Sequence, residues 1–196
     1  MIELNHESYL RMHEGADVLE ADRFGEKVLR LPDGTFLKLF RRKRLLSSAA
    51  WRPYAQRFAD NAAALSRLGI PSPRVIQVYR LPVIERDAVH YHPLEGRTLR
   101  ALIDADVAGS EVRFEFGAFV ARLHRLGVYF RSLHLGNVIV TPPGEMGLID
   151  IADLSLRTRS LGRNRRDRNF CHITRYPQDA AWLNSDDAFR RGYEDA

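Results

Sequence analysis

Cysteine, lysine and long apolar runs are all scarce in this sequence of 196 residues. The single cysteine, Cys171, cannot form a disulfide within the chain and lacks the neighbours of a zinc site, which indicates a buried or inert thiol in a reducing compartment. No stretch of about 18 apolar residues occurs, so no membrane-spanning helix is expected. The first 15 residues carry three glutamates instead of an apolar signal-peptide core. We therefore expect a cytoplasmic protein.

Because lysine is rare in this sequence, each lysine is a candidate functional residue. Only Lys27, Lys38 and Lys43 are lysines among 30 basic residues, and the formal net charge is +5. An excess of arginine is compatible with genome composition alone, but arginine is also the better partner for phosphate. With 45% hydrophobic residues, the chain can bury a core as one domain or as two small, closely joined lobes.

The first half of the sequence predicts strands followed by one helix. Residues 16–44 form a strand meander, in which Pro32, Asp33 and Gly34 mark a turn between "EKVLRL" and "TFLKLF". A helix is predicted over 47–68, and Asn61 is a polar residue on its inward stripe. Two strands follow at "RVIQVYRL" and "DAVHYH", and we place a boundary near residues 93–96.

The second half begins with the longest predicted helix, whose apolar stripe runs from Val112 to Leu123 and ends before Gly127. Two short strands, "VIV" and "GLID", are then expected around a turn at "TPPGE". An arginine-dense segment at 157–168 leads to a final helix predicted from about Gln178 to Tyr193.

Two polar residues flank the predicted hairpin. Asn137 precedes the strand "VIV", and Asp150 ends the strand "GLID". If these strands pair, their distal ends meet and bring an amide oxygen close to a carboxylate, with Asp153 near enough to assist. Magnesium carried by a nucleotide typically takes one or two carboxylates plus phosphate oxygens. The spacing therefore favours a site for a hard cation.

The order of the predicted elements resembles the protein-kinase-like fold. "SLHLGNVIV" followed by "LID" is similar to the loop of aminoglycoside phosphotransferases and lipopolysaccharide kinases, D-L-H-x-G-N followed by I-D. Over roughly residues 16–193 the chain most resembles the short bacterial lipopolysaccharide kinases, the Kdo and heptose kinase family with its InaA and toluene-tolerance relatives. The resemblance implies an α+β, two-lobed fold, with a small antiparallel β-rich N-lobe and one helix at 1–95 and a short, mainly helical C-lobe at 96–196.

The resemblance also implies ATP and Mg²⁺ as cofactors. Lys38 matches the strand lysine that holds the α- and β-phosphates, and Asn137 and Asp150 match the two magnesium ligands. His134 matches a loop position that aminoglycoside phosphotransferases fill with histidine. Asn61, the inward polar residue of the predicted helix, is a further cofactor-binding candidate. Tyr91, His92 and Leu94 match the hinge whose backbone contacts adenine.

Three departures from the family pattern bear on catalysis. Ser132 stands where the family has its catalytic aspartate, so the catalytic candidates become Ser132, His134 and Asp150. The helix glutamate that pairs with the strand lysine has no counterpart, because Asn61 faces inward and Asp60 is turned about 100° away. The glycine-rich phosphate loop is absent, although many lipid and small-molecule kinases also lack it.

Each candidate also has a purely structural interpretation. Asn137 and Asp150 would then cap loop backbone groups, Lys38 would extend from an edge strand into water, and His134 would be a hydrogen-bonding histidine. A nucleophilic Ser132 is disfavoured because no G-x-S-x-G turn surrounds it.

The arginine-dense segment has several interpretations. It is either a solvated face, a site for a phosphorylated acidic substrate such as the lipopolysaccharide inner core, or a contact with an anionic membrane surface or nucleic acid. Nucleic acid is the weakest of these, since no aromatic residue is interleaved before Phe170. The substrate-binding candidates are Arg163, Arg165, Arg166 and Arg168.

These observations leave three functions open. The first is an atypical lipopolysaccharide-kinase-like protein that binds Mg-ATP and transfers phosphate to an envelope sugar. The second is a pseudokinase, a nucleotide-dependent binding module that docks a phosphorylated glycolipid or acidic partner. The third is a scaffold that needs no nucleotide. All three are expected in the cytoplasm, with peripheral contact at the inner membrane as an alternative.

Overall fold

The computed structural model describes residues 1–42 and 52–196. The chain is a mixed α+β protein that divides into two compact units. The first unit consists of residues 1–67 and 72–93, and the second consists of residues 68–71 and 94–196. Each unit has its own strands and helices, and each is described by itself below.

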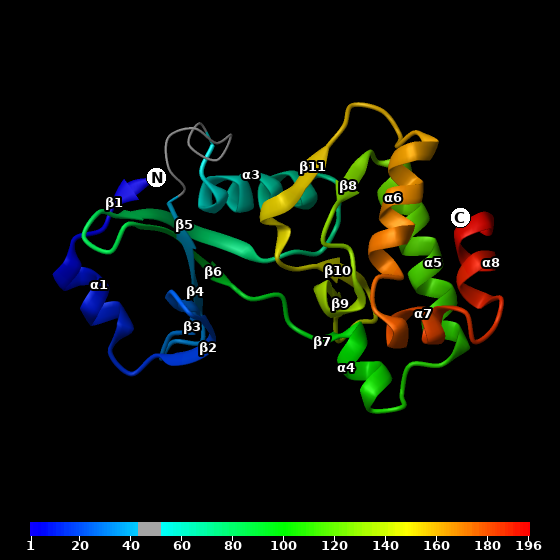
Figure 1. Ribbon diagram of the computed structural model, residues 1–196, viewed down its shortest axis with the longest axis horizontal. Helices are drawn as coiled ribbons and strands as arrows, with labels where there is room; N and C mark the ends of the chain where they lie inside the picture. The colour runs from blue at the N-terminus through cyan, green and yellow to red at the C-terminus, as the bar shows by residue number, and fades with distance from the viewer. Residues whose placement is uncertain (43–51) are drawn as a thin grey trace. The chain divides into compact units, whose positions relative to one another are not determined.

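The first unit is built on a sheet whose described strands follow the order β1-β5-β6-β4-β3-β2 (Figure 1). All neighbours in this sheet are antiparallel except β1 and β5, which are parallel. The strands are β1 (Ile2–Glu3), β2 (Asp17–Asp22), β3 (Gly25–Arg30), β4 (Phe36–Arg41), β5 (Arg74–Leu81) and β6 (Arg86–His92).

The predicted meander and its turn are confirmed. The turn between β3 and β4 closes because Oδ1 of Asp33 accepts hydrogen bonds from the Thr35 backbone N–H at 2.9 Å and from its hydroxyl at 2.6 Å. Gly34 takes a φ of 81°, a backbone conformation that glycine adopts without steric cost. Asp and Gly at these positions therefore fix the register in which β3 and β4 pair.

Two helices accompany this sheet, α1 (His6–His13) and α3 (Tyr54–Arg67). Helix α1 was not predicted from the sequence. Its start is capped by Asn5 Oδ1, which accepts from the Ser8 N–H at 2.8 Å. Tyr9 of α1 is buried in a cluster with leucines of β3 and β4. The helix predicted over 47–68 corresponds to α3, and its residues 47–51, like Lys43, lie outside the described part.

The second unit contains five described helices and two small sheets. The helices are α4 (Leu99–Asp104), α5 (Ser110–Arg125), α6 (Arg163–Ile173), α7 (Pro177–Leu183) and α8 (Ala188–Asp195). One sheet has the order β10-β9-β7 and the other pairs β11 with β8. Its strands and 3-10 turns are β7 (Arg97–Thr98), β8 (Val128–Phe130), η1 (Leu135–Asn137), β9 (Val138–Val140), β10 (Met146–Leu148), η2 (Ile151–Asp153) and β11 (Leu154–Leu156).

Two glycines let α5 and α8 approach closely, and these helices lie side by side in green and red in Figure 1. A Cβ added at Gly117 of α5 would overlap the carbonyl oxygen of Phe189 and lie 2.8 Å from the backbone nitrogen of Tyr193. A Cβ added at Gly192 of α8 would overlap the carbonyl oxygen of Phe114. Each glycine therefore provides the space that the other helix's backbone occupies.

The prediction of one final helix from Gln178 to Tyr193 is wrong, because two helices, α7 and α8, occupy that region. Short polar side chains bind backbone groups at the break. The Ser185 hydroxyl donates to the Trp182 carbonyl at 2.9 Å, and Oδ1 of Asp186 accepts from the Ala188 N–H at 2.8 Å. The arginine-dense segment, for which no helix was predicted, contains the start of α6.

Across residues 1–42 and 52–196, no helix is both long enough and apolar enough to cross a bilayer.

Candidate functional site

The predicted hairpin that flanks Asn137 and Asp150 is confirmed. Strands β9 and β10 are antiparallel, and Val138 pairs with Leu148 at their distal ends. One step further, the Ile149 N–H donates to the Asn137 carbonyl at 3.0 Å. Asp150 is the next residue, so the register brings the backbone of Asn137 alongside the residue that precedes the carboxylate.

The strand that leads to Asp150 is fixed by a close contact with the segment that follows Gly69. The Leu148 N–H donates to the Pro71 carbonyl at 2.9 Å. A Cβ added at Gly147 would lie 2.5 Å from that same oxygen and 2.6 Å from Cδ2 of Leu94. Gly147 thus permits the backbones to meet, and Leu94, an adenine-side candidate, packs on β10.

Asp150 has a left-handed backbone, with φ 53° and ψ 43°. Residues other than glycine rarely adopt this conformation, although aspartate is among those that tolerate it best. Such local strain costs on the order of 1 kcal/mol and tends to occur at functional sites, where the surrounding structure enforces it. Asp150 is also exposed, so its carboxylate is accessible to a ligand in solution.

Asn137 is buried, and its amide orientation is set by the loop. Its Nδ2 donates to the Ser132 carbonyl at 2.9 Å. Because Nδ2 is engaged in this bond, the amide oxygen is the atom of this side chain whose chemistry suits a cation. This arrangement fits the predicted pairing of an amide oxygen with the Asp150 carboxylate.

A metal site made of protein side chains alone is absent from the described residues, since no group of three or more His, Cys, Asp or Glu side chains is placed to hold an ion. Asn137 and Asp150 are a smaller set, an amide and one carboxylate. A nucleotide-borne Mg²⁺ requires only one or two protein ligands, because phosphates and water supply the others.

Ser132 lies in the same loop and is hydrogen bonded to an acid. Its hydroxyl donates to Oδ2 of Asp153 at 2.7 Å, and Nε of Arg131 lies 3.9 Å from the same oxygen. The Ser132 carbonyl accepts from the His134 N–H at 2.9 Å as well as from Asn137. The loop from Phe130 to Asn137 is therefore closed by its own polar groups.

His134 is a neutral, half-buried histidine. Burial lowers its pKa below the ordinary value of 6.5, and the Arg100 guanidinium lowers it further, while Asp179 and Asp150 oppose the shift. Its Nδ1 is buried and has no hydrogen-bond partner within the described residues. The ring contacts Tyr176 edge-on, with 5.6 Å between centroids. At neutral pH His134 can donate or accept one hydrogen bond but carries no charge.

Arg100, Tyr176 and Asp179 surround His134, and sequence reasoning did not identify them. Arg100 lies 4.8 Å above the Tyr176 ring and binds Asp179, which is 2% exposed. No sequence signal connects residues this far apart in the chain. A buried Asp at the start of a short helix becomes informative only once its arginine partner is known.

The first-unit candidates lie on the sheet and on α3. Lys38 is in the middle of β4, with its Cα opposite Val28 and Val89, and its Nζ lies 5.9 Å from the centre of the Phe40 ring. Asn61 is buried on α3, as its inward position predicted.

The hinge candidates differ in exposure. Tyr91 is 7% exposed and packs against Phe58, with ring centroids 5.1 Å apart, so its side chain belongs to the core. His92 ends β6 and is exposed. Each of these residues is therefore described by its own surroundings within the first unit.

The arginine candidates lie on the first turns of α6. Arg163, Arg165 and Arg168 are exposed and, with Gly162 and Asn164, line an open hollow of about 480 Å³. Arg166 differs, because it is half-buried and its Nε donates to the Leu161 carbonyl at 2.7 Å. Three of the four arginines therefore face solvent, and the fourth is held to the backbone.

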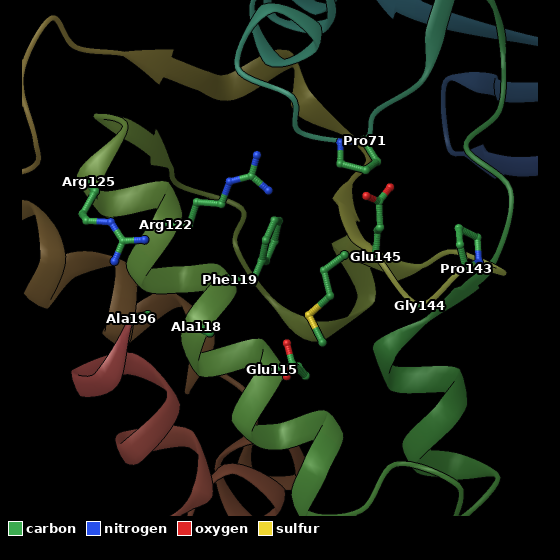
Figure 2. A pocket seen from close by; sticks show the side chains of 11 residues that line it. Pro71, Glu115, Ala118, Phe119, Arg122, Arg125, Pro143, Gly144, Glu145 and Ala196 are labelled. Atoms are coloured by element: carbon green, nitrogen blue, oxygen red, sulfur yellow. The ribbon is translucent and has the colours of Figure 1, made fainter.

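A second hollow, of about 440 Å³, opens on α5 and on the turn between β9 and β10. Figure 2 shows Arg122 reaching toward Pro71 from α5, and Glu145 reaching toward it from the turn. Arg122 donates to the Gly69 carbonyl at 2.9 Å and so is engaged in the fold. No predicted site residue lines this hollow.

Comparison with known proteins finds no family model that matches this chain and no significantly similar curated protein.

Proposed function

We propose that this chain is an atypical lipopolysaccharide-kinase-like protein with a two-lobed, kinase-like fold, which binds Mg-ATP and transfers phosphate to a sugar hydroxyl of the bacterial envelope. The observation that supports the proposal most is the β9–β10 hairpin. Its register places Asn137 beside Ile149, directly before the strained Asp150. An amide oxygen and an accessible carboxylate at one hairpin end suit the Mg²⁺ that a nucleotide carries.

The other residues have the roles that the resemblance implies. Lys38 would hold the α- and β-phosphates, and Asn137 and Asp150 would hold Mg²⁺, which would supply neutralisation of phosphate charge. The backbone around Tyr91, His92 and Leu94 contacts adenine, while Asn61 takes the place of the family's helix glutamate. His134 donates a hydrogen bond within the catalytic loop.

The acceptor side of the proposal rests on α6. The exposed Arg163, Arg165 and Arg168 line one hollow, where guanidinium groups suit the phosphates of a lipopolysaccharide inner core. Among the described residues, an acid lies near one of the three: Asp167, 4.0 Å from Arg163. A phosphorylated glycolipid acceptor places the protein in the cytoplasm, with peripheral contact at the inner membrane.

A pseudokinase is the second candidate, and Ser132 is the observation that favours it. A serine hydroxyl is uncharged at neutral pH, so the loop lacks the carboxylate that normally takes the acceptor proton. In this alternative the chain binds Mg-ATP and docks an acidic partner through α6 without transferring phosphate.

Thermal unfolding with Mg-ATP tests the shared part of both candidates. A ligand that binds only the native state at about 100 times its Kd adds about 2.7 kcal/mol of stability, which for a chain of this size raises Tm by roughly 5 to 10 °C. Asp150→Ala should abolish the magnesium-dependent part of the shift, and Lys38→Met should reduce the whole shift.

Asp104→Ala is the matched control, because Asp104 is an exposed acid on α4 outside the candidate site. It should keep the full shift. No shift for the native sequence at millimolar Mg-ATP would reject both candidates and leave a scaffold that needs no nucleotide. Turnover of ATP then separates the kinase from the pseudokinase.

A further inference from the structure

Ser132 and Asp153 are brought together by the ladder between β8 and β11. In this antiparallel ladder Phe130 pairs with Leu154. The residues that follow β8 and the residue that precedes β11 therefore leave the ladder at the same end. There the Ser132 hydroxyl donates to Oδ2 of Asp153 at 2.7 Å. The pair is thus a consequence of strand register and not of a flexible surface contact.

The two carboxylate oxygens of Asp153 have different surroundings. Its Oδ1 is buried and accepts no hydrogen bond from any described residue. Its Oδ2 accepts from Ser132, which is only half-buried, and lies 3.9 Å from Nε of the exposed Arg131. The side chain of Asp153 is 20% exposed, and the half-buried Ser132 hydroxyl gives its Oδ2 a hydrogen-bonded route to a molecule outside the protein.

Other charged or titratable groups near the pair do not replace this route. His172 of α6 is near enough for Asp153 to oppose the lowering of its pKa, but burial dominates and lowers that pKa, so His172 is neutral at pH 7. Arg131 is 60% exposed, and its attraction for Asp153 is weakened by water.

A purely structural role does not account for the arrangement. A buried carboxylate oxygen without a hydrogen bond destabilises the fold, because its hydration is lost and nothing replaces it. An amide or a second hydroxyl at residue 153 would hold Ser132 without burying a charge. What the carboxylate adds is basicity.

We propose that Ser132 and Asp153 form a proton relay, in which Asp153 supplies through the serine hydroxyl the basicity that the loop lacks at residue 132. The proposal rests on the phosphotransfer function proposed above and deepens it. Ser132 is the catalytic residue, since it touches the acceptor, and Asp153 is a positioning residue that acts through it.

In the relay, the oxygen of an acceptor hydroxyl attacks the γ-phosphorus of ATP. A new P–O bond forms, and the bond between the γ-phosphorus and the bridging oxygen breaks, which releases ADP. The acceptor's proton moves to the Ser132 oxygen while the serine's own proton moves to Oδ2 of Asp153. The resulting carboxylic acid then loses this proton to solvent, so the serine never carries a full negative charge.

Hydrolysis of Mg-ATP by the purified chain tests the relay, with water as the acceptor. A general base contributes roughly 10² to 10⁴ in rate, so Asp153→Asn should lower kcat at least about 100-fold. The KM for ATP should change by less than about threefold, because neither residue is assigned to nucleotide binding. The Tm shift with Mg-ATP should persist, which a merely structural loss of the pair would not allow.

Comparing threonine with valine at residue 132 measures the effect of the hydroxyl alone on kcat, because the two side chains have the same shape. Ser132→Thr should exceed Ser132→Val in kcat by about the same 100-fold factor. The double variant Ser132→Val, Asp153→Asn should be no slower than the slower single variant, since the two residues act as a unit. Asp104→Asn is the control for replacing an acid by an amide outside the relay.

Each outcome decides between specific possibilities. Equal kcat for Ser132→Thr and Ser132→Val, an unchanged kcat in Asp153→Asn, or losses that multiply in the double variant would each overturn the relay. Binding of Mg-ATP by the native sequence without any turnover would also overturn it, while leaving the nucleotide site intact. Failure to bind Mg-ATP at all would reject the proposed function itself.

Discussion

Arg100 on α4 and Asp179 on α7 form a two-pronged ion pair beside the loop that carries His134. Nε of Arg100 lies 3.2 Å from Oδ1 of Asp179, and a second nitrogen of the guanidinium binds Oδ2. Asp179 is 2% exposed and Arg100 is 28% exposed, so the carboxylate depends on this arginine for its compensating charge. The pair joins two helices that are distant in sequence.

The two partners of this ion pair should respond unequally to substitution. Arg100→Met leaves an uncompensated buried carboxylate and should lower the free energy of unfolding by about 3 kcal/mol. Asp179→Asn leaves a neutral amide and should cost less, about 1 kcal/mol. Urea denaturation measures both values. Arg11→Met, which breaks an exposed ion pair with Glu7, is the control and should cost under about 0.5 kcal/mol. Equal losses for the two variants would refute the asymmetry.

The stability of the fold should fall below neutral pH because of His124. This histidine is 1% exposed, and burial, with help from Arg166, lowers its pKa from 6.5 to about 4. As the pH falls, His124 therefore becomes protonated near pH 6.5 in the unfolded chain, but only near pH 4 in the folded chain. The contribution of neutral His124 to the free energy of unfolding is complete above pH 6.5. It is lost as the pH falls toward 4, a change of about 3 kcal/mol.

The test compares wild type with His124→Gln across this pH range. Glutamine can keep a hydrogen bond to the Tyr193 hydroxyl, which lies 2.8 Å from the histidine Nδ1, but it does not titrate. Its unfolding free energy should depend less on pH between 4 and 6.5. His90, His134 and His172 also have lowered pKa values and add to the pH dependence of both proteins. The contribution of His124 is therefore the difference in unfolding free energy between wild type and His124→Gln at each pH. His6→Gln, an exposed change, should leave the slope unaltered.

Alanine at Gly117 should destabilise the contact between α5 and α8. The added methyl overlaps the Phe189 carbonyl, and separating two packed helices typically costs about 3 kcal/mol, or roughly 6 to 12 °C in Tm. Gly109→Ala is the matched control, because a Cβ there meets nothing within 4 Å. If calorimetry gave the same Tm for both variants, the two helices would not be held by this backbone contact.

The four arginines on the first turns of α6, three of them exposed, should make binding to phosphorylated glycolipid sensitive to salt. Replacing Arg163, Arg165, Arg166 and Arg168 by glutamine should weaken binding to vesicles that contain this lipid and flatten the dependence on ionic strength. The control removes the same charge elsewhere, by replacing Arg11, Arg30, Arg190 and Arg191, and should keep most of the affinity. Identical salt curves for the two variants would assign α6 to a plain solvated surface.

The hairpin of Asn137 and Asp150 could be predicted from sequence because its information is local. Two short apolar strands, a turn rich in Pro and Gly, and a spacing of thirteen positions from Asn137 to Asp150 determine it almost completely. The pairing of Ser132 with Asp153 is different. It depends on β8 meeting β11, two strands of three residues each with little pattern of their own.

The helices that sequence analysis missed have weak apolar stripes. Only Tyr9 is buried on α1, and only Asn169 and Ile173 are buried on α6, so hydrophobic periodicity carries little signal there. The split between α7 and α8 was missed for a different reason. It depends on side-chain bonds to the backbone by Ser185 and Asp186, which compete with the helix only in the folded context.

The glycine contact between α5 and α8 also has a consequence for synthesis of the chain. About 60 residues separate the two helices, and at 5 to 20 residues per second a ribosome needs several seconds to add them. During that interval α5 has emerged, while the backbone that will cover Gly117 and Phe116 does not yet exist. The nascent chain therefore presents an uncovered apolar helix face for seconds, long enough for a chaperone to bind it before α8 arrives.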